Sequence, residues 1–182
     1  ITEIKRDIDK MYVILPFEKK FYEDKHHFPV EFVGHPLIDA IYNQPIVDPV
    51  LFRKENQLND KPIIAILHGS RKQEITKMLD VMLSVVNDFP DHQFVIAGAP
   101  SQEFSFYQKF ITQENIKFIS NKTYDLLRNA TAALVTSGTA TLETALFKVP
   151  EVVCYKGSWA SYQIAKRIIT LKYISLVNLI MD

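Results

Sequence analysis

The sequence is poor in several features on which whole classes of protein depend. Its single cysteine, Cys154, excludes an internal disulfide and a cysteine-rich zinc site. Its 21 lysine and arginine residues are balanced by 21 aspartate and glutamate residues, so the chain carries no formal net charge. A general nucleic-acid binder is usually clearly basic, and we therefore expect no nucleic-acid partner.

Long hydrophobic runs and targeting segments are also lacking. No stretch of about 18 consecutive apolar residues occurs, so the sequence predicts no transmembrane helix. The chain begins at Ile1, without an initiator methionine or a signal-peptide pattern, as we expect of an excised piece of a longer protein. Hydrophobic residues make up 47% and charged residues 23% of the chain, which is typical of a folded globular protein.

The pattern before residue 61 is short and irregular. Apolar runs at 12–15 and 30–33 predict strands, and the charged stretch 17–25 between them predicts a helix with aromatic residues on one side. Residues 34–60 are rich in proline and asparagine, and we interpret them as a linker in which 37–42 could form a helical turn.

From residue 61 onward, apolar strands alternate with helical patterns. The expected strands are 63–67, 94–97, 116–119, 132–135 and 152–155, and the expected helices are 75–86, 104–111, 123–129 (capped by Thr123), 139–147 and 159–170. A continuous apolar run such as the first strand is typical of a parallel strand covered on both faces. The alternation predicts an α/β fold with a Rossmann-like, doubly wound parallel sheet.

Because ligands of such sheets bind beyond the carboxyl ends of the strands, the loop after the first strand is a candidate site. There Gly69 lets the backbone approach a ligand, and Ser70 with Gln73 fits a capping box. Arg71 in the first turn opposes the helix dipole, which favours anions there by about 0.3–1 kcal/mol. Its position makes sense if Arg71 and the helix jointly hold a phosphate; the alternative is simply a well-capped helix.

The loop after the fourth strand has a second phosphate-compatible composition. It combines small hydroxyl side chains, one glycine and the free N–H groups of a helix start, in the run Ser137-Gly138-Thr139-Ala140-Thr141. Glu143, one turn inside that helix, can accept hydrogen bonds from two vicinal ribose hydroxyls. The alternative is again a capped helix with a dipole-favoured surface glutamate. Neither loop has the Walker pattern or the GxGxxG fingerprint.

Four motifs and the end of the chain carry a resemblance to a known family. In chain order they are Leu15–Tyr22, Val33–Pro36, Gly69–Glu74 and Ser137–Glu143, followed by a tail from Ala165 to Ile180. As an ordered set they resemble lipid-A-disaccharide synthase over essentially the whole chain. The resemblance implies a GT-B glycosyltransferase fold, represented here by its nucleotide-binding domain and a stub of the acceptor domain.

The resemblance also implies a reaction and its partners. The family joins UDP-2,3-diacylglucosamine to 2,3-diacylglucosamine 1-phosphate, inverts the anomeric centre and releases UDP, giving lipid A disaccharide 1-phosphate for lipopolysaccharide synthesis. No metal and no other cofactor is expected. The implied location is peripheral, on the cytoplasmic face of the inner membrane of a Gram-negative bacterium.

Domain boundaries follow from the same resemblance. Residues 1–33 would end an incomplete acceptor domain, residues 34–60 would link the domains, and residues 61–182 would form a UDP-sugar-binding domain that stops before the family's final helices. Most of the acceptor domain, with its expected general base, would be missing. We therefore expect this chain alone to bind UDP without turnover.

The implied site combines both loops. The diphosphate is expected to be held by Ser70, Arg71, Ser137, Gly138, Thr139 and Thr141, and the ribose by Glu143. The uracil is expected beside Phe118, Ile119 and Ser120, where exposed backbone at a strand end can pair with its edge. Two other functions stay open: another GT-B enzyme acting on UDP-N-acetylglucosamine, such as a 2-epimerase, or a nucleotide-binding module without chemistry.

The remaining candidates are mostly structural. His68 stands where the family usually has proline; it could contact phosphate, but we interpret it as a substitution that the turn tolerates. His35 could face an interdomain cleft or be a hinge residue satisfied by backbone. His26 and His27 lack a third ligand spaced for a metal, and Cys154 is interpreted as a small core residue.

One further stretch combines apolar and basic side chains near the end of the chain. It comprises Trp159, Tyr162, Ile168, Ile169 and Leu171 with Lys156, Lys166, Arg167 and Lys172. These residues could form a membrane-interfacial surface, with core packing of the apolar ones as the alternative.

Overall fold

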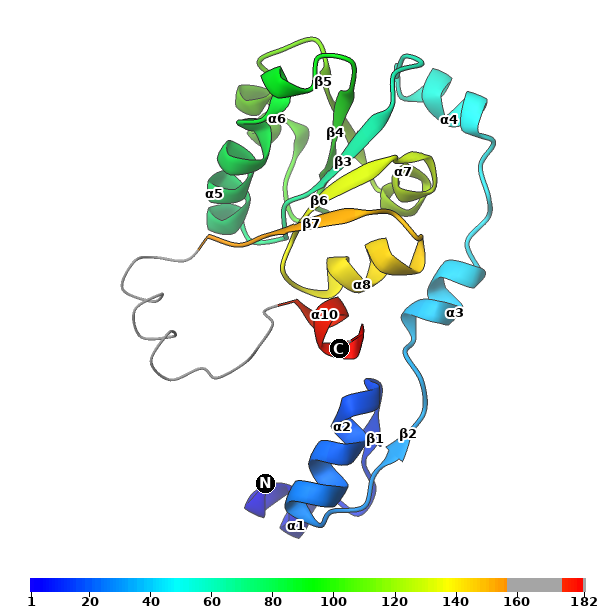
Figure 1. The fold of residues 1–182 in the computed structure, drawn as a ribbon, viewed down its shortest axis with the longest axis vertical. Helices are drawn as coiled ribbons and strands as arrows, with labels where there is room; N and C mark the ends of the chain where they lie inside the picture. Colours follow the sequence, from blue (N-terminus) through cyan, green and yellow to red (C-terminus); the bar gives the residue numbers. More distant parts are fainter. Residues whose placement is uncertain (157–174, 182) are drawn as a thin grey trace. The chain divides into compact units, whose positions relative to one another are not determined.

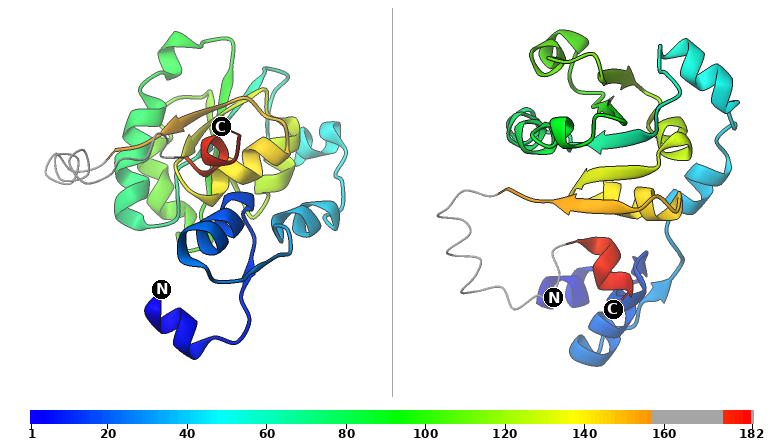
Figure 2. Two further views of the ribbon diagram at one scale, coloured as in Figure 1. Left: turned by 60° about the horizontal axis from the view of Figure 1, so that its bottom comes forward. Right: turned by 45° about the horizontal axis from the view of Figure 1, so that its top comes forward.

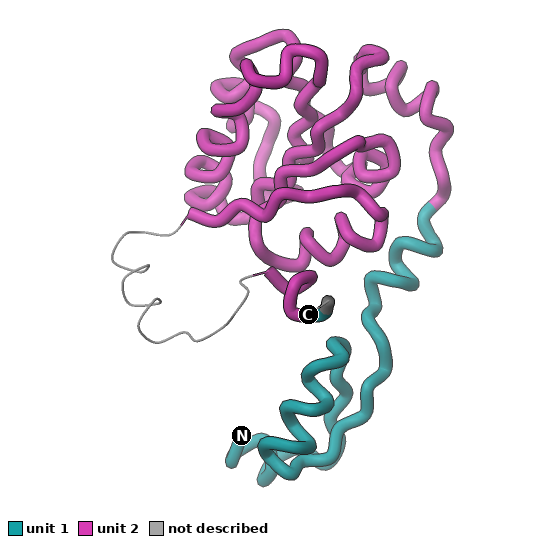
Figure 3. The backbone as a smooth tube through the Cα atoms, viewed as in Figure 1, with its two compact units in different colours: residues 1–44, 180–182 teal, residues 45–179 magenta. Residues whose placement is uncertain are grey.

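A computed structural model of the protein describes residues 1–156 and 175–181 (Figure 1). The helix predicted at 159–170 lies outside the described residues. The chain divides into two compact units, Ile1–Gln44 with Ile180–Asp182, and Pro45–Leu179 (Figure 3). The division falls inside the stretch 34–60 that the composition predicts as a linker.

The larger unit contains a five-stranded parallel sheet among its described residues. The strands are β3 (Ile63–Leu67), β4 (Gln93–Gly98), β5 (Ile116–Ser120), β6 (Ala132–Thr136) and β7 (Glu151–Cys154). They are hydrogen-bonded in the order β5-β4-β3-β6-β7, so the chain winds outward first on one side of β3 and then on the other. The predicted α/β fold with a Rossmann-like, doubly wound parallel sheet is confirmed.

Helices cover both faces of this sheet (Figure 1; Figure 2). One face carries α5 (Lys72–Leu83), α6 (Phe104–Tyr107) and the 3₁₀ helix η3 (Gln108–Phe110); the other carries α4 (Pro49–Glu55), α7 (Thr123–Asn129) and α8 (Thr139–Leu146).

Alternate residues of β3 enter two separate hydrophobic cores. Ile63, Ala65 and Leu67 pack with the face that includes α7, whereas Ile64 and Ile66 pack with the face that includes α5. All five residues of β3 are buried. Burial on both faces explains why this strand is an uninterrupted apolar run.

Helix boundaries differ from the predictions by a few residues. The helix predicted at 75–86 begins at Lys72 and ends at Leu83, and the 3₁₀ helix η2 (Val86–Asp88) follows it. The predicted cap at Thr123 is wrong, because the N-cap of α7 is Lys122 and no side chain makes a capping hydrogen bond there. Thr123 is instead the first helical residue.

The proline- and asparagine-rich stretch 34–60 contains α3 (Leu37–Tyr42) and α4. Asp48 caps α4, and its Oδ1 accepts hydrogen bonds from the N–H groups of Val50 and Leu51 at 2.9 and 3.0 Å. Phe52 is completely buried and anchors α4 to the core of the larger unit.

The smaller unit begins with α1 (Thr2–Asp7), a helix that the sequence did not predict. The predicted strand–helix–strand pattern follows it, as β1 (Tyr12–Val13), α2 (Pro16–Lys20) with the π-helix η1 (Phe21–Lys25), and β2 (Glu31–Phe32). The two short strands pair in parallel, with Tyr12 opposite Glu31. A short helix, α10 (Leu176–Met181), closes the described chain. Every helix in the described part of the chain falls short of the length and hydrophobicity needed to cross a membrane.

Candidate functional site

The carboxyl ends of β3 and β6 meet where the strand order reverses. The chain passes from β3 to β4 on one side and from β6 to β7 on the other, so the loops after β3 and β6 diverge and leave a crevice. A cavity of about 330 Å³ lies there. It is lined by the loops after β3, β4 and β6 and by the first turns of α5, α7 and α8.

The loop after β3 depends on a glycine. Gly69 has a φ of +90°, in the left-handed region that glycine adopts without strain. A Cβ at this position would lie 2.5 Å from Oε2 of Glu74, so the Glu74 side chain lies directly against Gly69. Both residues line the cavity, as does the exposed Ser70, whose carbonyl accepts a 2.9 Å hydrogen bond from the hydroxyl of Ser101.

The predicted capping box of Ser70 and Gln73 is wrong. Helix α5 begins at Lys72, its N-cap is Arg71, and no side chain makes a capping hydrogen bond there. Ser70 therefore lies one residue too early to cap the helix. Arg71 is exposed, does not line the cavity, and forms no ion pair with any residue that the structure describes.

The loop after β6 presents backbone and hydroxyl groups to the same cavity. Ser137, Gly138 and Thr139 line it. Thr141 is buried outside the lining, and its hydroxyl donates a 2.8 Å hydrogen bond to the carbonyl of Gly138, so this side chain shapes the loop. In the first turn of α8 the N–H of Thr141 donates to the carbonyl of Gly138 at 3.2 Å. The N–H groups before it, of Thr139 and Ala140, have no carbonyl one turn earlier in the helix, and such donors in a neutral loop suit an anion.

Glu143 lies one turn inside α8 and brings a half-buried carboxylate to the cavity. Burial raises its pKa, and a 3.1 Å hydrogen bond from the hydroxyl of Tyr124 to Oε1 partly offsets the rise. Burial and the neighbouring carboxylate raise the pKa of Tyr124, so its hydroxyl stays a donor. The sequence analysis missed Tyr124, because its contact with Glu143 arises only when α7 and α8 pack together.

Phe118, Ile119 and Ser120 lie beside the cavity and do not line it. Ser120 is paired with Gly98 at the ends of β5 and β4, and Gly98 does line the cavity. A side chain on Gly98 would collide with the ring of Phe118, which also packs against Tyr107 at a centroid distance of 4.8 Å. The Phe118 ring thus packs directly against Gly98. Ile119 is buried, and Ser120 is exposed at the end of β5.

Comparison with known proteins decides the family. A family model described as lipid-A-disaccharide synthetase matches residues 1–182. The chain belongs to this family. It is 38% identical to the lipid-A-disaccharide synthase of Idiomarina loihiensis, over 99% of this chain and 49% of that protein. It is 39% identical to the corresponding protein of Coxiella burnetii (strain Dugway 5J108-111), over 99% of this chain and 48% of that protein. The chain therefore spans about half the length of the curated relatives it matches.

A solved structure shares the fold. A putative UDP-N-acetylglucosamine 2-epimerase from Listeria monocytogenes matches with a TM-score of 0.59 at 18% identity, covering 95% of this chain and 49% of that one. This similarity concerns the fold alone, and it agrees with the GT-B class that the resemblance to lipid-A-disaccharide synthase implies.

His68, which we interpreted from the sequence as a substitution that the turn tolerates, is buried beneath the loop that follows β3. It is only 1% exposed, its Nδ1 lies 3.0 Å from the carbonyl oxygen of Gly69, and its ring lies 5.3 Å from that of Tyr107. Burial lowers its pKa to about 4. The imidazole is therefore neutral at neutral pH and offers no positive charge to a phosphate.

The other candidates of the sequence analysis do not line this cavity. The Nδ1 of His35 accepts a 3.2 Å hydrogen bond from the N–H of Leu37, in agreement with a residue satisfied by backbone. Cys154 packs at the edge of a core, and burial raises the pKa of its thiol, which argues against a nucleophile.

Two candidates remain, a metal site at His26 and His27 and a membrane-interfacial surface near the end of the chain. Over residues 1–156 and 175–181, no three histidine, cysteine or acidic side chains converge as metal ligands, and this includes the stretch with His26 and His27. The stretch 159–172 lies outside the described residues.

Proposed function

We propose that the cavity binds the UDP part of UDP-2,3-diacylglucosamine and that the chain is the UDP-binding half of a glycosyltransferase. The reaction proposed for the whole protein transfers the sugar to 2,3-diacylglucosamine 1-phosphate with inversion at the anomeric carbon, and UDP leaves. The observation that carries the proposal is the cavity where the strand order reverses, which joins two loops of phosphate-compatible composition. Membership of the lipid-A-disaccharide synthetase family supports the reaction and its substrates.

The diphosphate lies, in this proposal, between the N-termini of α5 and α8. Ser70 and the segment 137–139 line the cavity at that point. Arg71 stands at the N-cap of α5 without an ion-pair partner in the described structure, and its guanidinium reaches the phosphates from the rim. Thr141 contributes indirectly, by holding the carbonyl of Gly138.

The same groups assist departure of UDP. As the bond between the sugar and UDP breaks, negative charge grows on the diphosphate. Donors that are already fixed, here backbone N–H groups at two helix starts together with Arg71, stabilise that charge without rearranging. The proposal therefore needs no metal ion. The general base belongs to an acceptor domain outside these residues.

The nucleoside extends from the phosphates along the sheet edge. Glu143 accepts hydrogen bonds from the two ribose hydroxyls, because its carboxylate faces the cavity. The uracil lies at the ends of β4 and β5, where the paired residues Gly98 and Ser120 leave backbone groups for its edge. Because both sugars are acylated, the whole enzyme acts in this proposal as a peripheral protein at a membrane surface. Membership of the family supports the cytoplasmic face of the inner membrane as that surface.

Two measurements on this 182-residue chain test the proposal. Calorimetry with UDP should show binding, with uridine much weaker because it lacks the phosphates. A product assay with both acylated sugars should yield no disaccharide, because the chain lacks most of the acceptor domain and its general base. Failure to bind UDP would overturn the proposed site, and disaccharide formation would overturn the statement that the chain is only the UDP-binding half.

A further inference from the structure

A line of side-chain contacts leads from the Glu143 carboxylate back through α7 and α8. The hydroxyl of Tyr124 donates to Oε1 of Glu143 at 3.1 Å. The Tyr124 ring packs against Phe147, with ring centroids 5.3 Å apart. The guanidinium of Arg128 lies over the Phe147 ring, 5.4 Å from its centroid. Tyr124, which donates to Glu143, is thus packed against Phe147, and Phe147 in turn contacts Arg128.

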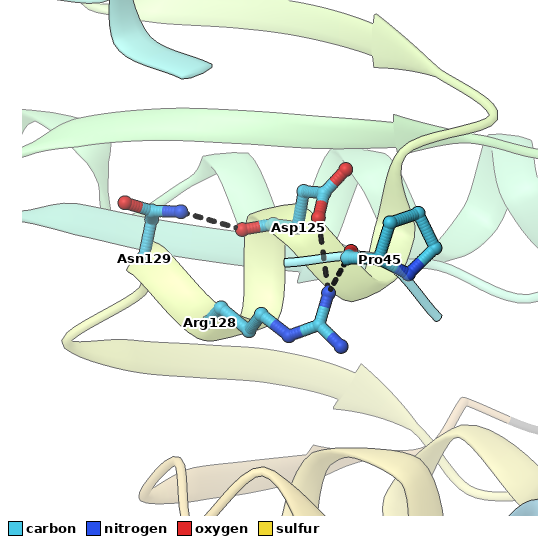
Figure 4. A network of polar contacts seen from close by, with 4 residues as sticks. All are labelled: Pro45, Asp125, Arg128 and Asn129. Atoms are coloured by element: carbon cyan, nitrogen blue, oxygen red, sulfur yellow. Dashed lines mark hydrogen bonds and ion pairs between the residues drawn. The ribbon is translucent and has the colours of Figure 1, made fainter. Parts of the chain in front are cut away.

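Arg128 is itself fixed by a polar network (Figure 4). Its Nη1 donates to Oδ1 of Asp125 at 3.1 Å and to the carbonyl of Pro45 at 3.2 Å. Asn129 donates to the carbonyl of Asp125 at 2.8 Å, within the same helix. The side chains of Arg128 and Asp125 are only 18% and 19% exposed, so solvent screens their attraction less than at an open surface. Helix α7 is thereby tied to the segment that leads into α4.

We propose that Tyr124 is a positioning residue of the nucleotide site, which orients the Glu143 carboxylate for the two ribose hydroxyls. Phe147 and Arg128 hold the Tyr124 ring in place. Tyr124 does not line the cavity, so it acts on the ligand only through Glu143. The inference rests on the proposed function, because it takes ribose as the partner of Glu143.

The hydrogen-bonding capacity of the carboxylate explains why a fixed donor is useful. A carboxylate offers about four lone-pair sites on its two oxygens, and Tyr124 occupies one of them on Oε1. Oε2 and the remaining site on Oε1 then point in set directions, as two vicinal hydroxyls require. The hydrogen bond also favours the ionised form, which opposes the rise in the Glu143 pKa that burial causes.

The test compares Tyr124→Phe with the unaltered chain and with Tyr42→Phe. Tyr42 is 86% exposed in the smaller unit and does not line the cavity, so Tyr42→Phe removes the same hydroxyl from a residue outside the site. Calorimetry is run with UDP and with 2′,3′-dideoxy-UDP. In Tyr124→Phe, UDP should bind about three- to tenfold more weakly, as loss of one hydrogen bond predicts. Binding of 2′,3′-dideoxy-UDP should be nearly unchanged, and Tyr42→Phe should alter neither ligand.

Two further measurements distinguish orientation of Glu143 by Tyr124 from a general contribution of Tyr124 to the stability of the fold. In a Glu143→Gln background, Tyr124→Phe should cause little additional loss, because the partner it orients is already altered. The ratio of UDP to 2′,3′-dideoxy-UDP affinity should fall on acidification as Glu143 is protonated, and in Tyr124→Phe the fall should begin at higher pH. The other titratable side chains that line the cavity are Glu74 and His68, and both are common to the two proteins.

The outcomes distinguish this inference from the proposed function. Failure of the unaltered chain to bind UDP overturns both. If the chain binds UDP but Tyr124→Phe weakens both ligands equally, or neither, Tyr124 does not position Glu143. An undiminished effect of Tyr124→Phe in the Glu143→Gln background also overturns the inference, because Tyr124 would then act through another group.

Discussion

Replacement of Arg71 by alanine separates binding of the diphosphate from support of the fold. Arg71 is exposed at the start of α5 and makes no ion pair with any described residue, so Arg71→Ala should change the melting temperature little. A hydrogen bond to a charged group is worth about 1.5–3 kcal/mol. Loss of the contact with the diphosphate should therefore weaken UDP binding roughly tenfold to a hundredfold.

The assay is calorimetry with UDP and with uridine, which lacks the phosphates. Uridine should bind Arg71→Ala and the unaltered chain about equally. Lys77→Ala is the matched control, because Lys77 is an exposed cation of the same helix that does not line the cavity; it should leave UDP binding unchanged. An equal loss for UDP and uridine in Arg71→Ala, or a similar loss in Lys77→Ala, would refute the assignment of Arg71 to the diphosphate.

Three further predictions concern other parts of the larger unit. Glu143→Gln should weaken UDP binding markedly, whereas the variant and the unaltered chain should bind 2′,3′-dideoxy-UDP with similar affinity. Lower thermal stability with intact UDP affinity would instead show that Glu143 only interacts with the helix dipole. Gly98→Ala should destabilise the fold by about 1–3 kcal/mol in urea unfolding, because the new methyl meets the Phe118 ring, and adding Phe118→Leu should recover most of that loss. Burial raises the pKa of Glu151 to about 7, and a hydrogen bond with Thr144 offsets only part of that rise. Because the pKa of this carboxyl is higher in the folded than in the unfolded protein, the fold loses stability as the pH rises from the unfolded-state pKa toward 7. Glu151→Gln should therefore raise the melting temperature at pH 8 but not at pH 4. An equal change in melting temperature at both pH values would contradict ionisation of Glu151 as the cause.

The sheet was predictable because its strands are buried on both faces. In β3 every residue is apolar, so the run stands out from the helices without any knowledge of its neighbours. The position of the candidate site followed from the same reasoning, since the carboxyl ends of parallel strands share one edge. Gly69 and Glu143, which both line the cavity, lie in the two loop–helix regions that follow β3 and β6.

Contacts between elements were not predictable from local pattern. The capping box at Ser70 failed because the helix begins one residue later than the motif requires, and Glu74 turns to Gly69. His68 looked like a loop residue, yet its ring is buried against Tyr107 of α6. The hydrogen bond between Tyr124 and Glu143 joins two helices, and it exists only once both are packed on the sheet.

The central claim is that UDP binds at the carboxyl ends of β3 and β6. Amide chemical-shift mapping during a UDP titration of the ¹⁵N-labelled chain tests it most directly, because it reports the place of binding as well as the affinity. The largest changes should occur at Gly69, Ser70, Gly138 and Thr139, which line the cavity. Changes confined to other surfaces, such as the amino ends of the same strands around Ile64 and Ala132, would contradict the account.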